Sequence, residues 1–145
     1  MDSVENEASL AIVRKLKASP RAVWRALTQP EALKQWMAPG EEFQVLVPEI
    51  DVRVGGRYRI VTTSPDGEEH DVSGVYREVV VARKLVYSWT RQSTTERESL
   101  VTFELTPAGD GTELLLKHES GDRKACTRHE QRWRRCVRRL QRLLA

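Results

Sequence analysis

The chain has 145 residues, of which 39% are hydrophobic and 31% are charged. This composition is typical of a folded globular domain and excludes a disordered polypeptide. The longest apolar runs contain only a few residues, far short of the roughly 18–20 that span a bilayer. The acidic, polar stretch Met1 to Ala8 carries no signal-peptide pattern. We therefore expect a cytoplasmic protein without a membrane span, with one domain over residues 1–145 and an ordered core over about 8–144.

The first part of the chain predicts one strand followed by two short helices. Residues 8–16 alternate between apolar and polar side chains well enough for a strand. Ser19 and Pro20 are suited to the cap and the first residue of a helix. A second short helix is predicted to begin at Pro30 and to stop at Pro39-Gly40. The apolar faces of the two helices contain Val23, Trp24 and Leu27, then Leu33, Trp36 and Met37.

The middle of the chain predicts a meander of antiparallel strands. The turn signals Gly55-Gly56, Pro65-Asp66-Gly67 and Gly109-Asp110-Gly111 separate segments that alternate large and polar residues. Such regularly spaced turns are typical of strands joined by hairpins. The predicted strands are residues 43–49, 57–62, 72–79, 85–90, 98–106 (ending at Pro107) and 112–119.

From residue 121 onward the periodicity becomes helical. Trp133, Val137, Leu140 and Leu144 recur at spacings of four, three and four, which predicts an amphipathic helix of some five turns. Ala125 and His129 extend the same stripe upstream. The sheet is the only large partner against which this stripe can be buried. We therefore predict an α+β fold in which an antiparallel, about seven-stranded sheet curves around a long C-terminal helix, with two short helices between strands 1 and 2.

Five segments carry a resemblance to a known family, and they occur in the family's order and spacing. They are residues 20–36 (PRAVWRALTQPEALKQW), 51–60 (DVRVGGRYRI), 83–89 (RKLVYSW), 99–103 (SLVTF) and 111–118 (GTELLLKH). Together they resemble the Hsp90 ATPase activator homologue family of the START-like, Bet v 1-like (SRPBCC) superfamily. The resemblance implies a helix-grip fold, a bacterial member with one domain, and binding of lipid, polyketide or aromatic ligands. It implies no universal catalytic residues.

The chain departs from the family pattern at two positions. The family commonly has glycine before the tryptophan of the last helix, where this chain has Arg132. Its second short helix usually begins with an aspartate cap before proline, where this chain has Gln29. The first departure bears on how closely the last helix approaches the sheet, and so on the shape of a cavity between them.

Because strand residues alternate between two faces, the strands predict an inward and an outward set. The inward set carries tyrosine, tryptophan and histidine rings whose polar tips can orient a ligand inside an apolar cavity. This set consists of Tyr58, Ile60, Thr62, Val72, Gly74, Tyr76, Leu85, Tyr87, Trp89, Val101, Phe103, Leu105, Leu114, Leu116 and His118. The alternative is that these residues form the core and bond their polar tips to the backbone. The outward set contains Arg57, Arg59, Arg77, Thr102, Glu104, Glu113 and Lys117. The candidate cavity residues are Trp36, Tyr58, Ile60, Tyr76, Tyr87, Trp89, Phe103, Leu116, His118, His129 and Trp133.

His118 and His129 are expected to point into the same interior and could titrate near neutral pH. Acid–base catalysis would need a positioned partner, which the sequence does not identify, so ligand hydrogen bonding and a purely structural role stay open. The pair His129-Glu130 lacks the second histidine of a zinc-protease helix, because residue 133 is tryptophan. Glycine-rich phosphate loops and a serine elbow are also absent from the sequence. We predict no catalytic residue, no metal and no cofactor.

The two cysteines, Cys126 and Cys136, fall in the predicted last helix. Ten helical residues separate them by roughly 15 Å, which is beyond disulfide reach. Neither has histidine or carboxylate partners at zinc-ligand spacing. We interpret both as structural or incidental thiols of a protein in a reducing compartment.

Basic residues are concentrated in the last helix. Residues 121–145 contain nine Lys or Arg and two acids, whereas the first 120 residues contain fifteen bases and nineteen acids. Such a ridge could bind nucleic acid, an anionic membrane or an acidic protein. We favour a solvated outer face, because a Glu130–Arg134 pair is predicted and no exposed aromatic residue is available to stack on bases. The ridge consists of Arg128, Arg132, Arg135, Arg139 and Arg142, with Arg134 and Arg138 beside it.

Three functional hypotheses follow from these features. The first is a protein that binds a small apolar or aromatic molecule between the sheet and the last helix. The second is a protein-binding module, such as an Hsp90-type chaperone regulator. The third is a cyclase-like enzyme that uses His118 or His129 inside the cavity. We expect a monomer or homodimer whose partner is a small ligand, with a chaperone or other protein as a possible second partner and no nucleic acid.

Overall fold

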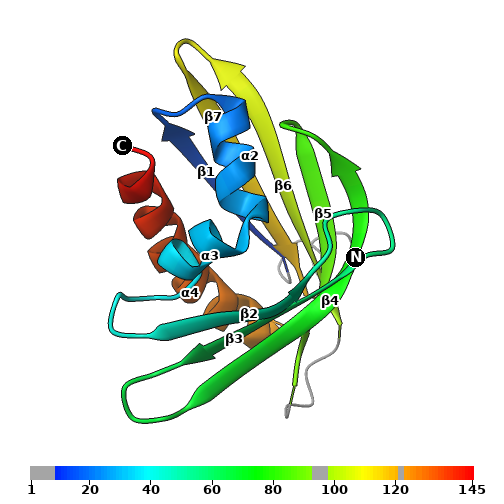
Figure 1. Cartoon of the computed structure of the whole chain (residues 1–145), viewed down its shortest axis with the longest axis vertical. Helices are drawn as coiled ribbons and strands as arrows, with labels where there is room; N and C mark the ends of the chain where they lie inside the picture. The colour runs from blue at the N-terminus through cyan, green and yellow to red at the C-terminus, as the bar shows by residue number, and fades with distance from the viewer. Residues whose placement is uncertain (1–8, 93–97, 121–122) are drawn as a thin grey trace.

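The computed structural model describes residues 9–92, 98–120 and 123–145. A seven-stranded antiparallel sheet is strongly curved, and three helices lie on its inner side (Figure 1). This arrangement confirms the predicted α+β class and the two short helices between the first two strands. The predictions for Met1 to Ala8 and for the start of the last helix at Gly121 and Asp122 lie outside the described residues.

The helical bounds agree closely with the sequence signals. Helix α2 begins at a proline, and Ser19 caps it by accepting a hydrogen bond from the Ala22 backbone N–H at 3.2 Å. Gln29, the residue before α3, makes no side-chain cap hydrogen bond. The elements in chain order are β1 (Ser9–Leu16), α2 (Pro20–Thr28), α3 (Pro30–Trp36), β2 (Gln44–Ile50), β3 (Arg57–Thr63), β4 (Glu69–Val80), β5 (Lys84–Arg91), β6 (Ser99–Ala108), β7 (Gly111–Glu119) and α4 (Arg123–Leu143).

The sheet order is β1-β7-β6-β5-β4-β3-β2, so the first strand pairs with the last. Every consecutive pair from β2 to β7 is a neighbour in the sheet, and α2 and α3 occupy the long connection from β1 to β2. Helix α4 follows β7 and contacts β1, β7 and α3. Two predicted strand ends are wrong by more than one residue. Strand β4 begins at Glu69 and not at Val72. Strand β6 continues through Pro107, because its ladder with β7 extends to the pair Ala108 and Gly111, next to the turn.

The predicted alternation of faces is confirmed, since every residue of the inward set is buried. Among the outward set, Arg57, Arg59 and Arg77 are exposed as predicted. Glu113 is exposed as well, Glu104 and Lys117 are half-buried, and Thr102 is buried, with only 8% of it exposed. Its short side chain lies between Val86 of β5 and Lys117 of β7, which are its neighbours across the sheet.

A continuous series of aromatic contacts links the short helices, the sheet and α4. The Trp36 indole N–H donates to the Ala26 carbonyl at 2.8 Å and so joins α3 to α2. The Trp36 ring meets Phe103 of β6 edge-on, with centroids 6.5 Å apart. Phe103 in turn meets Trp133 of α4 edge-on at 5.9 Å. These rings fix the distance between α3, the sheet and α4, because edge-to-face packing leaves no gap between them.

Gly74 of β4 allows Tyr58 to cross the strand and reach β5. The Tyr58 hydroxyl donates to the Ser88 carbonyl at 2.7 Å, and Gly74 lies opposite Tyr58 in the ladder between β3 and β4. A Cβ atom at residue 74 would lie 1.9 Å from the Ser88 carbonyl oxygen and 2.8 Å from Cε1 of Tyr58. The residue therefore has to be glycine because of close approach.

We predict that Gly74→Ala lowers the free energy of unfolding by about 1–3 kcal/mol, which is the usual cost of overpacking. The added methyl group must push either the β5 backbone or the Tyr58 ring away. Urea unfolding followed by circular dichroism measures the loss. Ser73→Ala, at the neighbouring position, serves as the control and should cost less than about 1 kcal/mol. Equal losses in the two variants would contradict this reading.

Candidate functional site

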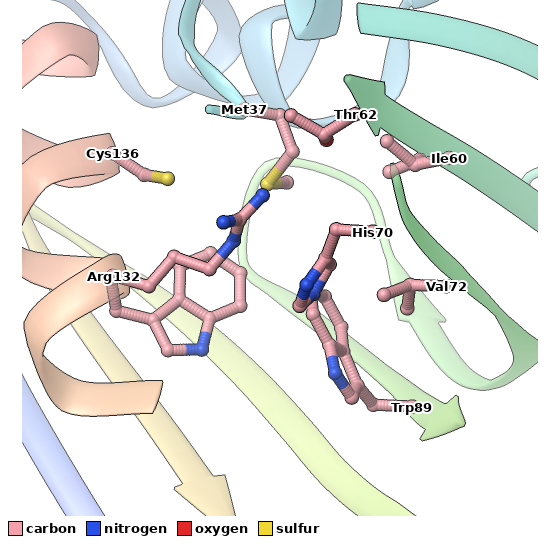
Figure 2. Close-up of a pocket in the computed structure, with 9 residues that line it drawn as sticks. Met37, Ile60, Thr62, His70, Val72, Trp89, Arg132 and Cys136 are labelled. Carbon is pink, nitrogen blue, oxygen red and sulfur yellow. The ribbon is translucent and has the colours of Figure 1, made fainter. Parts of the chain in front are cut away.

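A small internal cavity lies between α4 and the part of the sheet formed by β3, β4 and β5. Its volume is about 10 Å³, which is close to the room that one water molecule needs. Pockets that hold drug-sized molecules measure roughly 300–1,000 Å³, so the interior is nearly filled in this conformation. The lining residues, drawn in Figure 2, are Met37, Ile60, Thr62, His70, Val72, Trp89, Arg132, Trp133 and Cys136.

Three of the eleven residues predicted to form a cavity line this one: Ile60, Trp89 and Trp133. His129 lies beside it in an outer groove. The remaining seven are buried in the packed core: Trp36, Tyr58, Tyr76, Tyr87, Phe103, Leu116 and His118. The wide cavity expected from the inward rows is therefore not open in this conformation.

The reason is mutual packing of the inward rings. The rings of Tyr58 and Tyr87 have centroids 4.9 Å apart, and Tyr76 lies 5.7 Å from each of them. Burial raises the pKa of all three hydroxyls, most strongly for Tyr58 and Tyr87, so these tyrosines are neutral in the folded protein. This end of the interior is a closed aromatic core.

His118 connects α4 to the sheet through both of its ring nitrogens. The Trp133 indole N–H donates to His118 Nδ1 at 2.8 Å. An indole nitrogen can only donate, so Nδ1 carries no hydrogen and the proton of the neutral ring lies on Nε2. Nε2 is 2.7 Å from the Ser99 hydroxyl, which itself donates to the Trp89 carbonyl at 3.3 Å. His118 therefore has a structural role with a defined tautomer.

The prediction that His118 and His129 share one interior is confirmed. Their rings stack in parallel, with centroids 4.1 Å apart and an angle of 4° between the planes. Burial, with a smaller contribution from His129, lowers the pKa of His118 to about 2. His118 is thus neutral near pH 7, and protonating it would break its bond from Trp133. It is not placed to act as a general acid or base at neutral pH.

Arg132 is the residue that the sequence interpretation placed most differently. It was assigned to the solvated ridge, but its side chain lines the cavity, and Figure 2 shows it extending from α4 toward Met37. Burial lowers the pKa of its guanidinium, and the nearby charge of Arg91 lowers it further. Within the described parts of the chain, no carboxylate forms an ion pair with Arg132 and no acceptor receives a hydrogen bond from it.

The other arginines of the ridge follow the prediction more closely. Arg128, Arg134, Arg135, Arg138 and Arg142 are exposed. The predicted pair is confirmed, since Arg134 Nε donates to a Glu130 carboxylate oxygen at 3.0 Å. Arg139 is half-buried and donates to the Ala38 carbonyl at 3.0 Å, which ties α4 to the end of α3.

Two buried nitrogen atoms at the cavity, Nε2 of His70 and Nε1 of Trp89, have no hydrogen-bond partner in the part of the chain that the structure describes. Figure 2 shows both rings on the sheet side, facing Arg132. Burial lowers the pKa of His70 to about 3, and the charges of Arg132 and Arg91 contribute. His70 is therefore neutral and can either donate or accept at Nε2. Trp89 can only donate.

The cavity lies next to an outer groove of about 220 Å³, lined by Glu68, His70, Arg91, Arg128, His129 and Arg132. His70 and Arg132 line both spaces, so they form the boundary between the cavity and the surface. A larger groove of about 640 Å³ lies farther along α4, between its arginines and the segment that follows α3.

His70, Arg132 and Cys136 are the cavity residues that sequence reasoning missed. His70 has the same strand parity as Val72 and pairs with Thr62, so extending the β4 row by one step would have found it. Arg132 and Cys136 are four residues apart, at the edge of the Trp133 stripe. Residue type argued against Arg132, since arginine is almost never buried unless paired.

The described residues offer no obvious metal site and no membrane span. No group of three or more His, Cys, Asp or Glu side chains that could hold a metal occurs among them. Cys126 and Cys136 are both buried and free, and burial raises the pKa of the Cys136 thiol to about 11. None of the helices in these segments has the length and apolar character needed to cross a bilayer.

A curved antiparallel sheet around a C-terminal helix, with two short helices after the first strand, defines the helix-grip class within the START-like, Bet v 1-like superfamily. Residues 17–145 match the family described as "Activator of Hsp90 ATPase homolog 1-like protein". The chain belongs to this family. A search of curated proteins gives no match.

Several solved structures are similar over nearly the whole chain. Protein CV1439 from Chromobacterium violaceum has 27% sequence identity and a TM-score of 0.84, covering 94% of this chain and 96% of that one. The AHSA1 protein from Silicibacter pomeroyi has 28% identity and a TM-score of 0.82, covering 94% and 97%. Protein NE0264 from Nitrosomonas europaea has 25% identity and a TM-score of 0.80, covering 96% and 95%.

The depressed pKa values of His70 and His118 predict that the protein loses stability in mild acid. The unfolded chain binds a proton at each histidine near pH 6.5, whereas the folded protein does so only near pH 3 and 2. The stabilisation is complete above pH 6.5 and is lost as the pH falls, by up to ~1.4 kcal/mol per pH unit for each histidine. Urea unfolding at several values between pH 7.5 and 4.5 measures this slope.

A His118→Gln variant tests the assignment to this residue, because glutamine can still accept from Trp133 and donate to Ser99. Its unfolding free energy should fall less steeply with acid, by about one bound proton. A slope unchanged from that of the wild type would show that His118 does not contribute.

Proposed function

We propose that the protein binds a small, largely apolar molecule at the cavity between the sheet and α4. The observation that carries this proposal is a pair of buried nitrogen atoms, on His70 and Trp89, that have no partner among the described residues and lie in the same wall as Met37, Ile60 and Val72. Native cores leave few such atoms, and each one costs about 1–3 kcal/mol. A ligand that hydrogen-bonds to both nitrogen atoms recovers this free energy. The cavity of about 10 Å³ has room for one water molecule at most, which recovers only part of it.

A ligand larger than the cavity requires side chains of the wall to move. Met37 and Arg132 are the suitable ones, because both are long, flexible side chains and Met37 follows directly after α3. Within the described residues, Arg132 makes no bond that would hold it in place. Since Arg132 and His70 separate the cavity from the outer groove, outward movement of Arg132 would connect the two spaces. The aromatic core beyond Phe103 need not change.

The cyclase-like alternative lacks an acid–base group at its first candidate position. Both nitrogens of His118 are engaged, to Trp133 and to Ser99. The proposal is therefore limited to binding and includes no reaction.

We predict that a panel of fatty acids, flavonoids and polyketides contains ligands that raise the melting temperature and change the fluorescence of Trp89 and Trp133. Ligand present at one hundred times its dissociation constant should add about 2.7 kcal/mol of stability. Trp89→Phe removes the indole N–H while it keeps an aromatic ring, so ligands that accept this hydrogen bond should bind about tenfold more weakly.

Trp24→Phe is the matched control, because Trp24 is buried on α2 and does not line the cavity. It should bind the same ligands as the wild type does. If no member of the panel binds to or stabilises the wild-type protein, the proposed function is wrong.

A second candidate function is binding of an acidic protein segment, in line with the description of the family. The observation that favours it is the groove of about 640 Å³ along α4, lined by Arg135, Arg138, Arg139 and Arg142. Glu41 and Glu42 lie on its opposite wall, which reduces the positive field. Purified Hsp90 is the direct test: binding that is lost in the double variant Arg138→Glu, Arg142→Glu would support this function. The absence of both binding and ATPase stimulation with the wild-type protein would remove it.

A further inference from the structure

We propose that the ligand of this cavity carries a carboxylate, which pairs with the guanidinium of Arg132 while the apolar body of the ligand extends between the sheet and α4. This inference rests on the proposed function and names the chemical class of its ligand.

The first observation is a mostly buried cation that has no counter-ion within the described segments. Arg132 lines the cavity, and no carboxylate of the described segments lies within ion-pairing distance of it. Removing a guanidinium from water without a paired anion is unfavourable, and buried arginines are normally paired for this reason. Glu68 lies in the adjoining groove but forms no ion pair with Arg132. A ligand carboxylate would supply the missing charge.

The second observation is the set of polar groups around the cavity, which are donors rather than anions. Trp89 offers an indole N–H without a partner, and His70 can donate from Nε2. Thr62 adds a hydroxyl, and the Cys136 thiol stays protonated because burial raises its pKa to about 11. Among residues 9–92, 98–120 and 123–145, no aspartate or glutamate lines the cavity. A wall with one cation, several hydrogen-bond donors and no carboxylate of its own is complementary to a negatively charged group that only accepts hydrogen bonds.

The size and composition of the wall favour a carboxylate over a phosphate. A carboxylate has one charge and two coplanar oxygens, which fit the fork of a single guanidinium. A phosphate group carries more charge and more oxygens than one arginine and two or three donors can satisfy. Met37, Ile60 and Val72 form the apolar part of the wall, so the rest of the ligand should be apolar.

The position of Arg132 at the boundary fits entry from the outer groove. That groove contains Arg91, Arg128 and Arg132 and a single acidic residue, Glu68. Because Arg132 has no ion pair among the described residues, its charge is available to attract an anion that enters the groove. The carboxylate can therefore remain at the boundary with Arg132 and His70, while the apolar body takes the inner position against Met37, Ile60 and Val72.

The experiment compares ligands that differ only in the carboxylate. Octanoate and 1-octanol form one pair, and 1-naphthoate and 1-naphthalenemethanol form a second pair with an aromatic body. Isothermal titration calorimetry at neutral pH measures the dissociation constants for the wild type and for Arg132→Met and Arg132→Lys. Arg138→Met is the matched control, because it removes the same charge from an exposed position of the same helix.

We expect the wild type to bind at least one acid about tenfold more tightly than its alcohol, as a partly buried ion pair predicts. Arg132→Met should lose this preference and bind the alcohol at least as tightly as the wild type does, because no guanidinium has to be displaced. Arg132→Lys should keep part of the preference, because it keeps the charge but not the fork. Arg138→Met should behave like the wild type. Circular dichroism checks that each variant is folded, and if Arg132→Met is not, the wild type and Arg132→Lys still decide the question.

Two results would overturn the inference, and they differ in what they say about the proposed function. Equal binding of acids and alcohols by the wild type, or an unchanged preference in Arg132→Met, would refute the carboxylate class and leave small-molecule binding intact. Failure of the wild type to bind any acid or alcohol at millimolar concentration, together with failure of the wider panel, would refute both.

Discussion

The hydrogen bond from the Trp133 indole to His118 Nδ1 determines how the last helix is set against the sheet. It is buried, it measures 2.8 Å, and it leaves the second nitrogen of His118 to bond Ser99 of β6. One helix residue is thereby fixed to two strands. Because α-helical residues follow one another at about 100°, fixing Trp133 also fixes the directions of its neighbours. His129, one turn earlier, stacks on His118.

The same rotation turns Arg132 and Cys136 toward the cavity. Bonds farther along the helix reinforce it, from Arg139 to the Ala38 carbonyl and from Gln141 to the Lys15 carbonyl. The direction of Arg132 is thus a consequence of the way α4 is anchored and does not depend on a partner of its own. A helix rotated by one residue would put Arg132 in the Trp133 position, where its charged side chain would replace the indole that packs against Trp89 and Phe103. The anchoring and the charge at the cavity are therefore coupled.

Sequence reasoning predicted the fold because the signals for it are periodic. Alternation, turn residues and the stripe at Trp133, Val137 and Leu140 each depend on residue type and spacing, and all of these are read directly from the chain. The same reasoning located the two histidines in one interior. It could not predict how much space the inward rings leave, because that depends on contacts such as those among Tyr58, Tyr76 and Tyr87. A periodic pattern gives the direction of a side chain but not the fit between side chains.

Arg132 was missed for a related reason. Its position at the edge of the helix stripe is compatible with either the surface or the interior, and residue type favoured the surface. The structure resolves this ambiguity, because the contacts of Trp133 and His129 with His118 set the rotation of α4. His70 was missed because the predicted strand began three residues too late, at Val72, whereas β4 begins at Glu69. His70 lies near the start of a strand and Arg132 at the edge of a helix face, and sequence patterns are least reliable at such boundaries.

The interior therefore has two ends with different chemistry. At one end the Tyr58 hydroxyl and the Trp36 indole donate to backbone carbonyls. At the other end, the nitrogens of His70 and Trp89 have no partner, and the charge of Arg132 lacks a counter-ion among the described residues. Ligand entry there requires Arg132 to move, and the ligand's charge decides whether this costs free energy. A neutral ligand has to take the place of the guanidinium, whereas a carboxylate can hold it at the boundary and neutralise it. Arg132 would then both close the cavity and determine which class of ligand can enter it.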